Sequence, residues 1–181
     1  MRLPKGELKL LKSIGKLASG NPRSSCNVFA VLEAIKNRRR GITEPLLNDY
    51  IFDSDLPNLT LPSKQFIRQR MSTAKFFVQL DAKAYFDQFG LSEEVAGFFG
   101  VGDLLLQRTL PMGFRPSCHI AQRISERLLD MGISEVLVAA YIDNFLFWSD
   151  DLQQLRKAVD TFLERCRLAG ILINEGWIFL S

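Results

Sequence analysis

Short apolar runs that end at polar residues recur from about residue 76 onward. Residues 137–140 and 145–148 are apolar and flank Tyr141-Ile142-Asp143-Asn144, a pattern typical of a β-hairpin with the polar Asp143–Asn144 pair at its tip. Residues 76–80 form a similar run that leads directly into Asp81. The pattern therefore predicts buried strands that each deliver an aspartate to one end.

Apolar residues at helical spacing predict helices elsewhere in the chain. We expect them at residues 7–18, 27–37, 92–99, 116–131 and 150–169, with a further helix capped by Ser63. Residues 75–81, 104–110 and 171–173 predict strands, residues 19–25 a linker and residues 49–62 a loop. The alternation of βαβ and hairpin units predicts an α/β (α+β) fold with a sheet of the split-βαβ type.

Asp81 and Asp143 suggest cation chemistry, although a simpler interpretation stays open. Two strands that each deliver one aspartate are the minimum scaffold for two-metal phosphoryl or nucleotidyl transfer. An Asp-Asn pair after an apolar run is also common in plain hairpin turns, because both residues tolerate unusual backbone angles. These residues alone do not decide between the two.

Three ordered motifs favour the catalytic interpretation. The segment 81–89 (DAKAYFDQF), the segment 110–122 (LPMGFRPSCHIAQ) and Tyr141-Ile142-Asp143-Asn144 have the order and spacing of polymerase motifs A, B and C. From about Arg38 to about Asn174 the chain resembles a reverse transcriptase, and it is most similar to retrotransposon enzymes. The resemblance implies a truncated palm at residues 76–181, a fingers-like region at 26–75 and a basic N-terminal segment with linker at 1–25.

The resemblance also implies roles for particular residues. Asp81 and Asp143, with the Ala82 carbonyl, would hold Mg²⁺ or Mn²⁺, and Asn144 would stand beside them in the catalytic hairpin. A second set would contact the incoming deoxynucleoside triphosphate: Phe86 as a steric gate against a 2′-hydroxyl, Met112, Gly113, Arg38 and Arg40. A third set, Arg39, Pro111, Arg115 and Gln122, would contact the RNA template and DNA primer. For Arg38–Arg40 an ordinary helix-end role is equally open, for Phe86 a core position, and for Gln122 a surface position.

Two departures from the family pattern leave an alternative function open. Asn144 replaces the second aspartate of the hairpin, and no lysine follows Asn174 where the family has one. The chain also stops at Ser181, before any thumb or RNase H region of the family. The alternative is a reverse-transcriptase-like module without catalysis that binds RNA or protein. An RNA-templated RNA polymerase is disfavoured, because Phe86 would clash with a ribose.

Composition and charge are compatible with both functions. Residues 1–40 carry ten Lys/Arg and two Glu, a balance of +8, whereas the remainder has a balance of −5. A basic segment beside an acidic centre suits a protein that holds phosphates and cations. The sequence has no run of about 18 apolar residues, so we expect no membrane partner. The three separated cysteines predict reduced thiols in an intracellular compartment. A partner role for the remainder of a retrotransposon polyprotein stays open.

Overall fold

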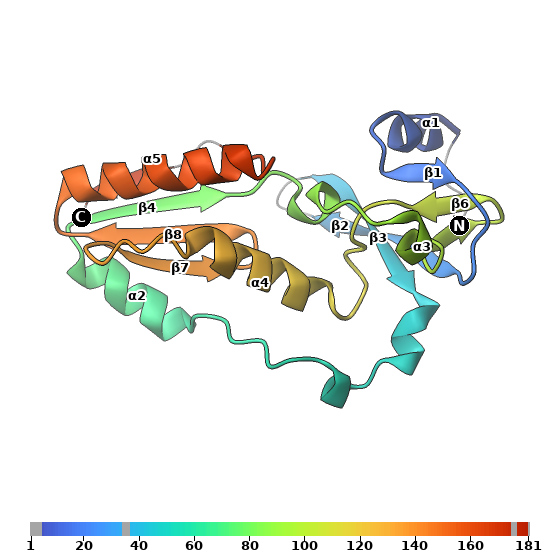
Figure 1. Cartoon of the computed structure of the whole chain (residues 1–181), viewed down its shortest axis with the longest axis horizontal. Helices are drawn as coiled ribbons and strands as arrows, with labels where there is room; N and C mark the ends of the chain where they lie inside the picture. The colour runs from blue at the N-terminus through green and yellow to red at the C-terminus, as the bar shows by residue number, and fades with distance from the viewer. Residues whose placement is uncertain (1–4, 34–36, 175–176, 181) are drawn as a thin grey trace. The chain divides into compact units, whose positions relative to one another are not determined.

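The computed structural model describes residues 5–33, 37–174 and 177–180, which form two compact units (Figure 1). The first unit contains the described residues up to Pro57 together with Phe86–Ser117. The second contains Asn58–Tyr85 and the described residues from Cys118 onward. The division at residues 25 and 75 implied by the family resemblance stays a prediction.

The second unit is built on a four-stranded antiparallel sheet. Its strands are β4 (Phe76–Asp81), β7 (Leu137–Tyr141), β8 (Asn144–Ser149) and β9 (Trp177–Leu180), in the spatial order β7-β8-β4-β9. Helix α4 (Ser117–Leu129) follows β4 in the chain, and helix α5 (Leu152–Leu168) connects β8 to β9. Because β8 lies between β4 and β7, the sheet has the expected split-βαβ topology.

One face of this sheet packs against α5, which runs alongside the strands in Figure 1. The helix forms because buried residues recur at Leu155, Ala158, Phe162 and Cys166, and because the Asp151 carboxylate accepts the backbone N–H groups of Gln153 and Gln154. The Phe162 ring lies 4.6 Å from that of Phe145 and 5.3 Å from that of Phe147. These aromatic contacts fix which side of β8 faces the core.

The opposite face changes from apolar to polar along the strands. At one end, Phe77, Leu146 and Trp148 form a buried cluster, and helix α2 (Lys64–Thr73) covers it through Phe66 and Ile67. Alternation along the strands then places Gln79, Asp81 and Asn144 on the same face. The apolar end anchors the sheet, and the polar end supplies the candidate chemistry.

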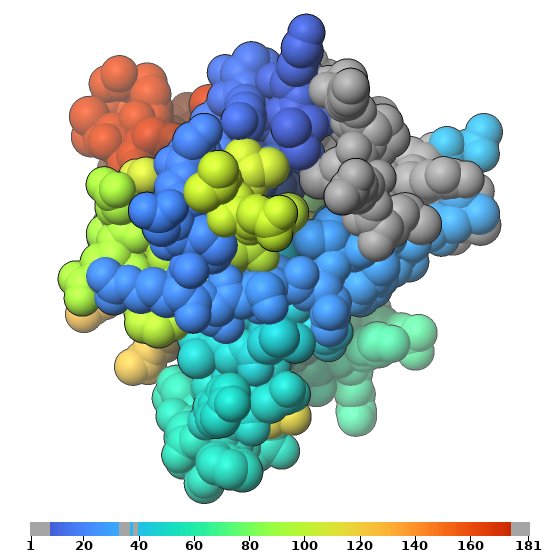
Figure 2. Space-filling model, turned by 90° about the vertical axis from the view of Figure 1, so that its right-hand side faces the viewer, coloured from blue at the N-terminus to red at the C-terminus, as the bar shows by residue number. Residues whose placement is uncertain are grey.

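The first unit contains two small sheets. Its described elements are α1 (Lys5–Ser13), β1 (Leu17–Ser19), β2 (Cys26–Glu33), β3 (Arg38–Pro45), η2 (Leu46–Tyr50), η3 (Asp53–Asp55), α3 (Glu93–Ala96), β5 (Gly100–Gly102) and β6 (Leu105–Gln107), and η4 (Tyr85–Gln88) leads into it from the second unit. One sheet has the order β1-β6-β5 and the other is the β2–β3 hairpin. Figure 2 shows the face on which β1 and the β5–β6 segment lie side by side.

The predicted fold class is confirmed, but the predicted helix at residues 27–37 is wrong. Within it, β2 pairs in antiparallel register with β3, from Cys26 opposite Pro45 to Glu33 opposite Arg38. Val28, Val31 and Leu32 do have helical spacing, but Val28, Phe29 and Val31 are residue types that favour strands. Hydrogen bonding to β3, a later segment of the chain, makes Cys26–Glu33 a strand. Residues 34–36 lie outside the described part.

Several predicted boundaries shift, and one predicted strand is replaced. The helix expected at 7–18 ends at Ser13, and residues 17–19 form β1 instead. The strand expected at 104–110 is limited to Leu105–Gln107. The strand expected at 171–173 is only an isolated bridge between Ile173 and Ala82, and β9 begins at Trp177. No helix in the described part of the chain has the length and apolar character that a membrane crossing requires.

Replacing Phe162 by alanine tests the core that supports the sheet. Phe162 is completely buried between Phe145 and Phe147, so Phe162→Ala leaves a cavity and is expected to lower the free energy of unfolding by about 3–5 kcal/mol. Urea unfolding monitored by circular dichroism measures this. Leu168→Ala on the same helix is the matched control, because Leu168 is 73% exposed. Equal losses in the two variants would contradict the assigned core.

Candidate functional site

The pairing of β4 with β8 brings the predicted aspartates to one end of the sheet. Asp81 lies opposite Asn144 in the register, and Asn144 directly follows Asp143. The backbone N–H of Ala82 donates to the Asp143 carbonyl oxygen at 2.8 Å. Asp81 and the Asp143–Asn144 pair therefore belong to adjacent, hydrogen-bonded segments of the second unit.

The hairpin turn itself is formed by Ile142 and Asp143. Tyr141 pairs with Asn144, so Asn144 is already the first residue of β8, and the turn lies one residue earlier than the predicted Asp143–Asn144 tip. Ile142 has a φ of +55°, in the left-handed region that β-branched residues rarely adopt. Such a conformation costs free energy and persists only where the surroundings hold it in place.

Helix α4 supplies the groups that hold Ile142. The Gln122 side-chain oxygen accepts the Ile142 backbone N–H at 2.8 Å, and the Ser125 hydroxyl donates to the Ile142 carbonyl oxygen. The Gln122 amide also donates to the Ala140 carbonyl oxygen at 3.1 Å. Both backbone polar groups of Ile142 are thus bonded to one helix, which fixes the residue that precedes Asp143.

Tyr85 extends this hydrogen-bond chain. Its hydroxyl lies 2.8 Å from the Ser125 hydroxyl. Ser125 has one proton and gives it to the Ile142 carbonyl, so Tyr85 is the donor in its bond with Ser125. Burial raises the pKa of Tyr85 to about 12, which keeps this proton in place at neutral pH.

Each aspartate of the site accepts a hydrogen bond from an amide side chain. The Asn174 amide donates to Asp81 Oδ2 at 2.8 Å, and the Asn144 amide donates to Asp143 Oδ1 at 3.0 Å. The backbone N–H of Asn174 also donates to the Asp81 carbonyl oxygen at 2.7 Å. Burial, and then the negative charge of Asp143, raise the pKa of the Cys118 thiol, so Asp143 acts electrostatically on the start of α4.

The donor set of this site fits a hard divalent cation. A carboxylate accepts at about four lone-pair positions, so Asp81 and Asp143 can each accept one amide N–H and still ligate a cation. Mg²⁺ is typically held by one or two protein carboxylates, with water and phosphate oxygens completing the shell. In the described residues no three His, Cys, Asp or Glu side chains gather as a metal-ligating group. The Asp81–Asp143 pair is the candidate centre because the β4–β8 register brings the two segments that carry these aspartates together.

Several residues predicted to contact the nucleotide, template or primer lie in the first unit. The Gly113 backbone N–H donates to the Thr43 carbonyl oxygen of β3 at 3.1 Å. A Cβ on Gly113 would lie 2.6 Å from that oxygen, so the close approach requires glycine. Asn48 bridges the segment, since its amide donates to the Gly113 carbonyl at 2.7 Å and its oxygen accepts the Arg115 backbone N–H at 3.0 Å.

The remaining predicted residues of the first unit have mixed environments. The Arg115 guanidinium donates to the Ile51 carbonyl oxygen and lies 3.7 Å from an Asp53 carboxylate oxygen. Pro111 is buried, whereas Arg40, Phe86 and Met112 are half-buried. The side chains of Arg38 and Arg39 lie outside the described part. Contacts of all these residues with nucleotide, template or primer stay predictions.

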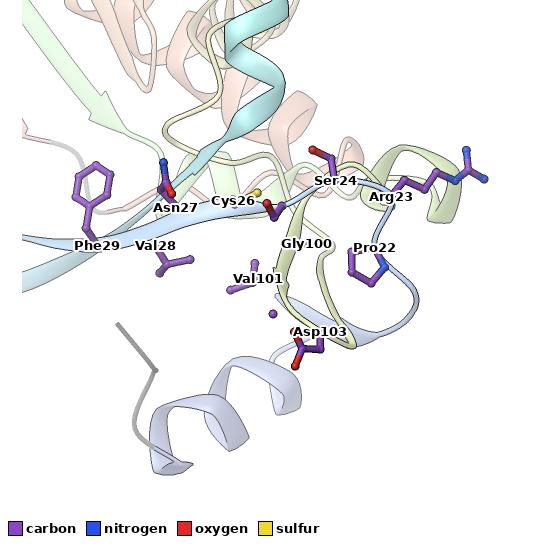
Figure 3. A pocket seen from close by; sticks show the side chains of 12 residues that line it. Pro22, Arg23, Ser24, Cys26, Asn27, Val28, Phe29, Gly100, Val101 and Asp103 are labelled. Atoms are coloured by element: carbon purple, nitrogen blue, oxygen red, sulfur yellow. The ribbon is translucent and has the colours of Figure 1, made fainter.

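A cleft in the first unit does not coincide with the predicted site. It has a volume of about 740 Å³ and lies between the start of β2 and the segment from Gly100 to Asp103 (Figure 3). Arg23 extends away from Val101 in this view, and its guanidinium lies 5.7 Å from the centre of the Phe98 ring. The lining combines polar residues such as Ser24 and Asn27 with apolar ones such as Val28 and Val101.

The sequence did not predict which side chains would hold the two aspartates and the turn in place by hydrogen bonds. Gln122 was predicted to contact the template, with an ordinary surface position as the alternative. It is only 3% exposed and bonds to the hairpin turn, so the surface position is wrong, whereas the template contact stays a prediction. Its polar side chain on the buried face of α4, near Ala121 and Ser125, is the signal that could have indicated this. Gln79 shares the face of Asp81 by strand alternation. Asn174 matches a position of the family pattern, but its distance from Asp81 in the sequence gave no indication of their hydrogen bond.

Comparisons with known proteins give distant viral relatives. No family model matches the chain. It is 23% identical over 188 residues to a genome polyprotein of Petunia vein clearing virus (isolate Hohn), an alignment that covers 100% of this chain and 8% of the polyprotein. It is 25% identical over 132 residues to polyprotein P3 of Commelina yellow mottle virus, covering 71% of this chain and 7% of that protein. The chain thus spans less than a tenth of these viral polyproteins.

Tyr85→Phe tests the hydrogen-bond chain that supports the turn. Loss of the bond to Ser125 is expected to lower the free energy of unfolding by about 0.5–1.5 kcal/mol at neutral pH. Burial raises the pKa of Tyr85 in the folded state from 10.0 to about 12. The stabilisation of the folded wild type by the Tyr85 hydroxyl is therefore fully present below pH 10 and is lost as the pH rises through 12.

Chemical unfolding of both proteins at several pH values measures the difference. The matched control is Tyr141→Phe, because Tyr141 is a more exposed tyrosine on β7, the strand that leads into the same turn. If Tyr85→Phe changes stability no more than Tyr141→Phe does, the chain from Tyr85 to Ile142 contributes nothing to the fold.

Proposed function

We propose that this chain is the fingers and palm region of a reverse transcriptase that forms part of a longer retroelement polyprotein. The observation that carries the proposal is the pairing of Asp81 with the Asp143–Asn144 turn across β4 and β8. This pairing brings together two aspartate-bearing segments that are far apart in sequence. The substrates would be an RNA template, a DNA primer and deoxynucleoside triphosphates.

In this proposal Asp81 and Asp143 hold the cations. Bound Mg²⁺ would activate the primer 3′-hydroxyl and neutralise the triphosphate. The chain's own residues set the position of these ligands: Asn174 fixes Asp81, and Gln122 and Ser125 fix the turn that carries Asp143. Precise placement of this kind is what nucleotidyl transfer requires, because positioning and electrostatics supply most of the catalysis.

The charge distribution and the distant relatives support the same proposal. Residues 1–40 have a balance of +8, and Arg40 lies on β3, the strand that contacts Gly113. A basic hairpin next to a glycine that permits close backbone approach suits a nucleotide or template site. The similarity to segments of viral polyproteins agrees with an origin in a polyprotein.

A second candidate function is a non-catalytic module that binds RNA through the same fold. The observation in its favour is Asn144, whose side-chain oxygen accepts the Gln79 amide at 2.7 Å. The site then has one carboxylate at the hairpin where the related enzymes usually have two. A module of this kind would keep the basic surface and show no nucleotide incorporation.

Primer extension on an RNA template separates the two functions. With Mg²⁺ or Mn²⁺ and deoxynucleotides, we expect the wild-type chain to extend the primer. Asp81→Asn and Asp143→Asn should each lower incorporation by about 100-fold or more, because each removes a cation ligand worth several kcal/mol in the transition state. Asp160→Asn, an exposed position on α5, is the matched control and should have no effect.

RNA binding is measured on the same proteins by filter retention. Background incorporation by the wild type, with RNA binding unchanged in Asp81→Asn, would support the non-catalytic module. Loss of RNA binding in Asp81→Asn and in the Asp160→Asn control alike would indicate damaged folding and contradict the assigned roles.

A further inference from the structure

Gln79 is hydrogen-bonded to Asn144 at the candidate centre. Its side-chain amide donates to the Asn144 side-chain oxygen at 2.7 Å, and the Asn144 amide donates in turn to Asp143 Oδ1 at 3.0 Å. Gln79 lies two residues before Asp81 on β4 and diagonally across from Asn144 on β8. Diagonal neighbours on one face of a sheet are within reach of long side chains.

The direction of this hydrogen-bond chain follows from the chemistry of its end. An ionised carboxylate only accepts hydrogen bonds, so Asn144 must turn its NH₂ group toward Asp143. The Asn144 oxygen then points to the other side, where it meets a donor, the NH₂ group of Gln79. The Gln79 NH₂ group therefore donates to the Asn144 oxygen in the one amide orientation that lets Asn144 donate to Asp143.

This orientation determines what Asn144 does at the site. Its oxygen accepts from Gln79, so the Asn144 side chain presents its N–H group to Asp143. Asn144 then serves as a neutral donor that holds one carboxylate oxygen of Asp143 in place. A second aspartate at position 144 would instead place a like charge beside Asp143.

We propose that Gln79 is a positioning residue, which orients the Asn144 amide so that Asp143 presents its carboxylate to a divalent cation. The cation part of this inference rests on the proposed function, whereas the orientation of the amide does not. Gln79 acts through Asn144 and touches neither cation nor substrate. Its effect should therefore vanish when residue 144 has no amide.

A double-mutant cycle on the full chain tests this dependence. The variants are Gln79→Met, which keeps the size but removes the donor, Asn144→Ala, and the two combined. Mn²⁺ binding followed by electron paramagnetic resonance should weaken roughly three- to tenfold in Gln79→Met, the size of one net hydrogen bond. Gln79→Met should have no further effect in the Asn144→Ala protein. Gln65→Met, at an exposed position on α2, is the matched control.

A second measurement does not depend on the cation. In ¹⁵N-labelled protein, the side-chain amide resonances of Asn144 should shift in Gln79→Met and in Asp143→Ala, and remain in place in Gln65→Met. Unchanged Asn144 resonances in Gln79→Met overturn the proposal, as does an equal loss of Mn²⁺ affinity with and without the Asn144 amide. If Gln79→Met does not fold, Gln79→Leu replaces it.

The two proposals fail in different ways. Wild-type Mn²⁺ binding no tighter than that of an Asp81→Asn/Asp143→Asn protein would contradict the cation site, and with it the positioning of a cation ligand. Shifted Asn144 resonances in that case would still establish the orientation of the amide. Tight wild-type binding with no effect of Gln79→Met would contradict only the role of Gln79.

Discussion

The register of β4 against β8 is the constraint on which the candidate site depends. It places Asp81 opposite Asn144 and, on the same face, Phe77 opposite Trp148. A slip of one residue would turn Gln79 and Asp81 toward the face that packs on α5. The register is fixed from both sides, by the α2 cluster around Trp148 and by the rings of Phe145, Phe147 and Phe162. The apolar ends of the strands thus determine where the polar ends meet.

The polar end of the sheet is costly to form, and the surrounding side chains offset that cost. Ile142 has a left-handed backbone conformation that is unfavourable for its branched side chain. Gln122 and Ser125 bond to its N–H and its carbonyl, and Tyr85 bonds to Ser125. Fully satisfied buried networks of this kind are rigid and specify one arrangement. Strain and a complete polar network at a single turn are typical of a functional site.

The parts of the structure that depend on local pattern could be predicted from the sequence. Helix α5 follows from its apolar spacing, and the β7–β8 hairpin from two apolar runs around a polar pair. The helix at 27–37 was predicted wrongly, because its residues pair with 38–45 and spacing alone carries no information about a partner strand. The bonds from Asn174 to Asp81 and from Asn48 to Gly113 join residues 93 and 65 positions apart, which no local pattern indicates. The aspartates were therefore recognised, whereas most of the side chains that position them were not.

The central claim is that Asp81 and Asp143 together bind a divalent cation at the end of β4 and β8. Crystals soaked in Mn²⁺ test it directly, because anomalous scattering locates the ion independently of any assay. The account predicts an anomalous peak at about 2.0–2.3 Å from one carboxylate oxygen of each aspartate, distances typical of hard cations with oxygen ligands. A soaked crystal with Mn²⁺ bound elsewhere on the chain, and none between these two side chains, would contradict it.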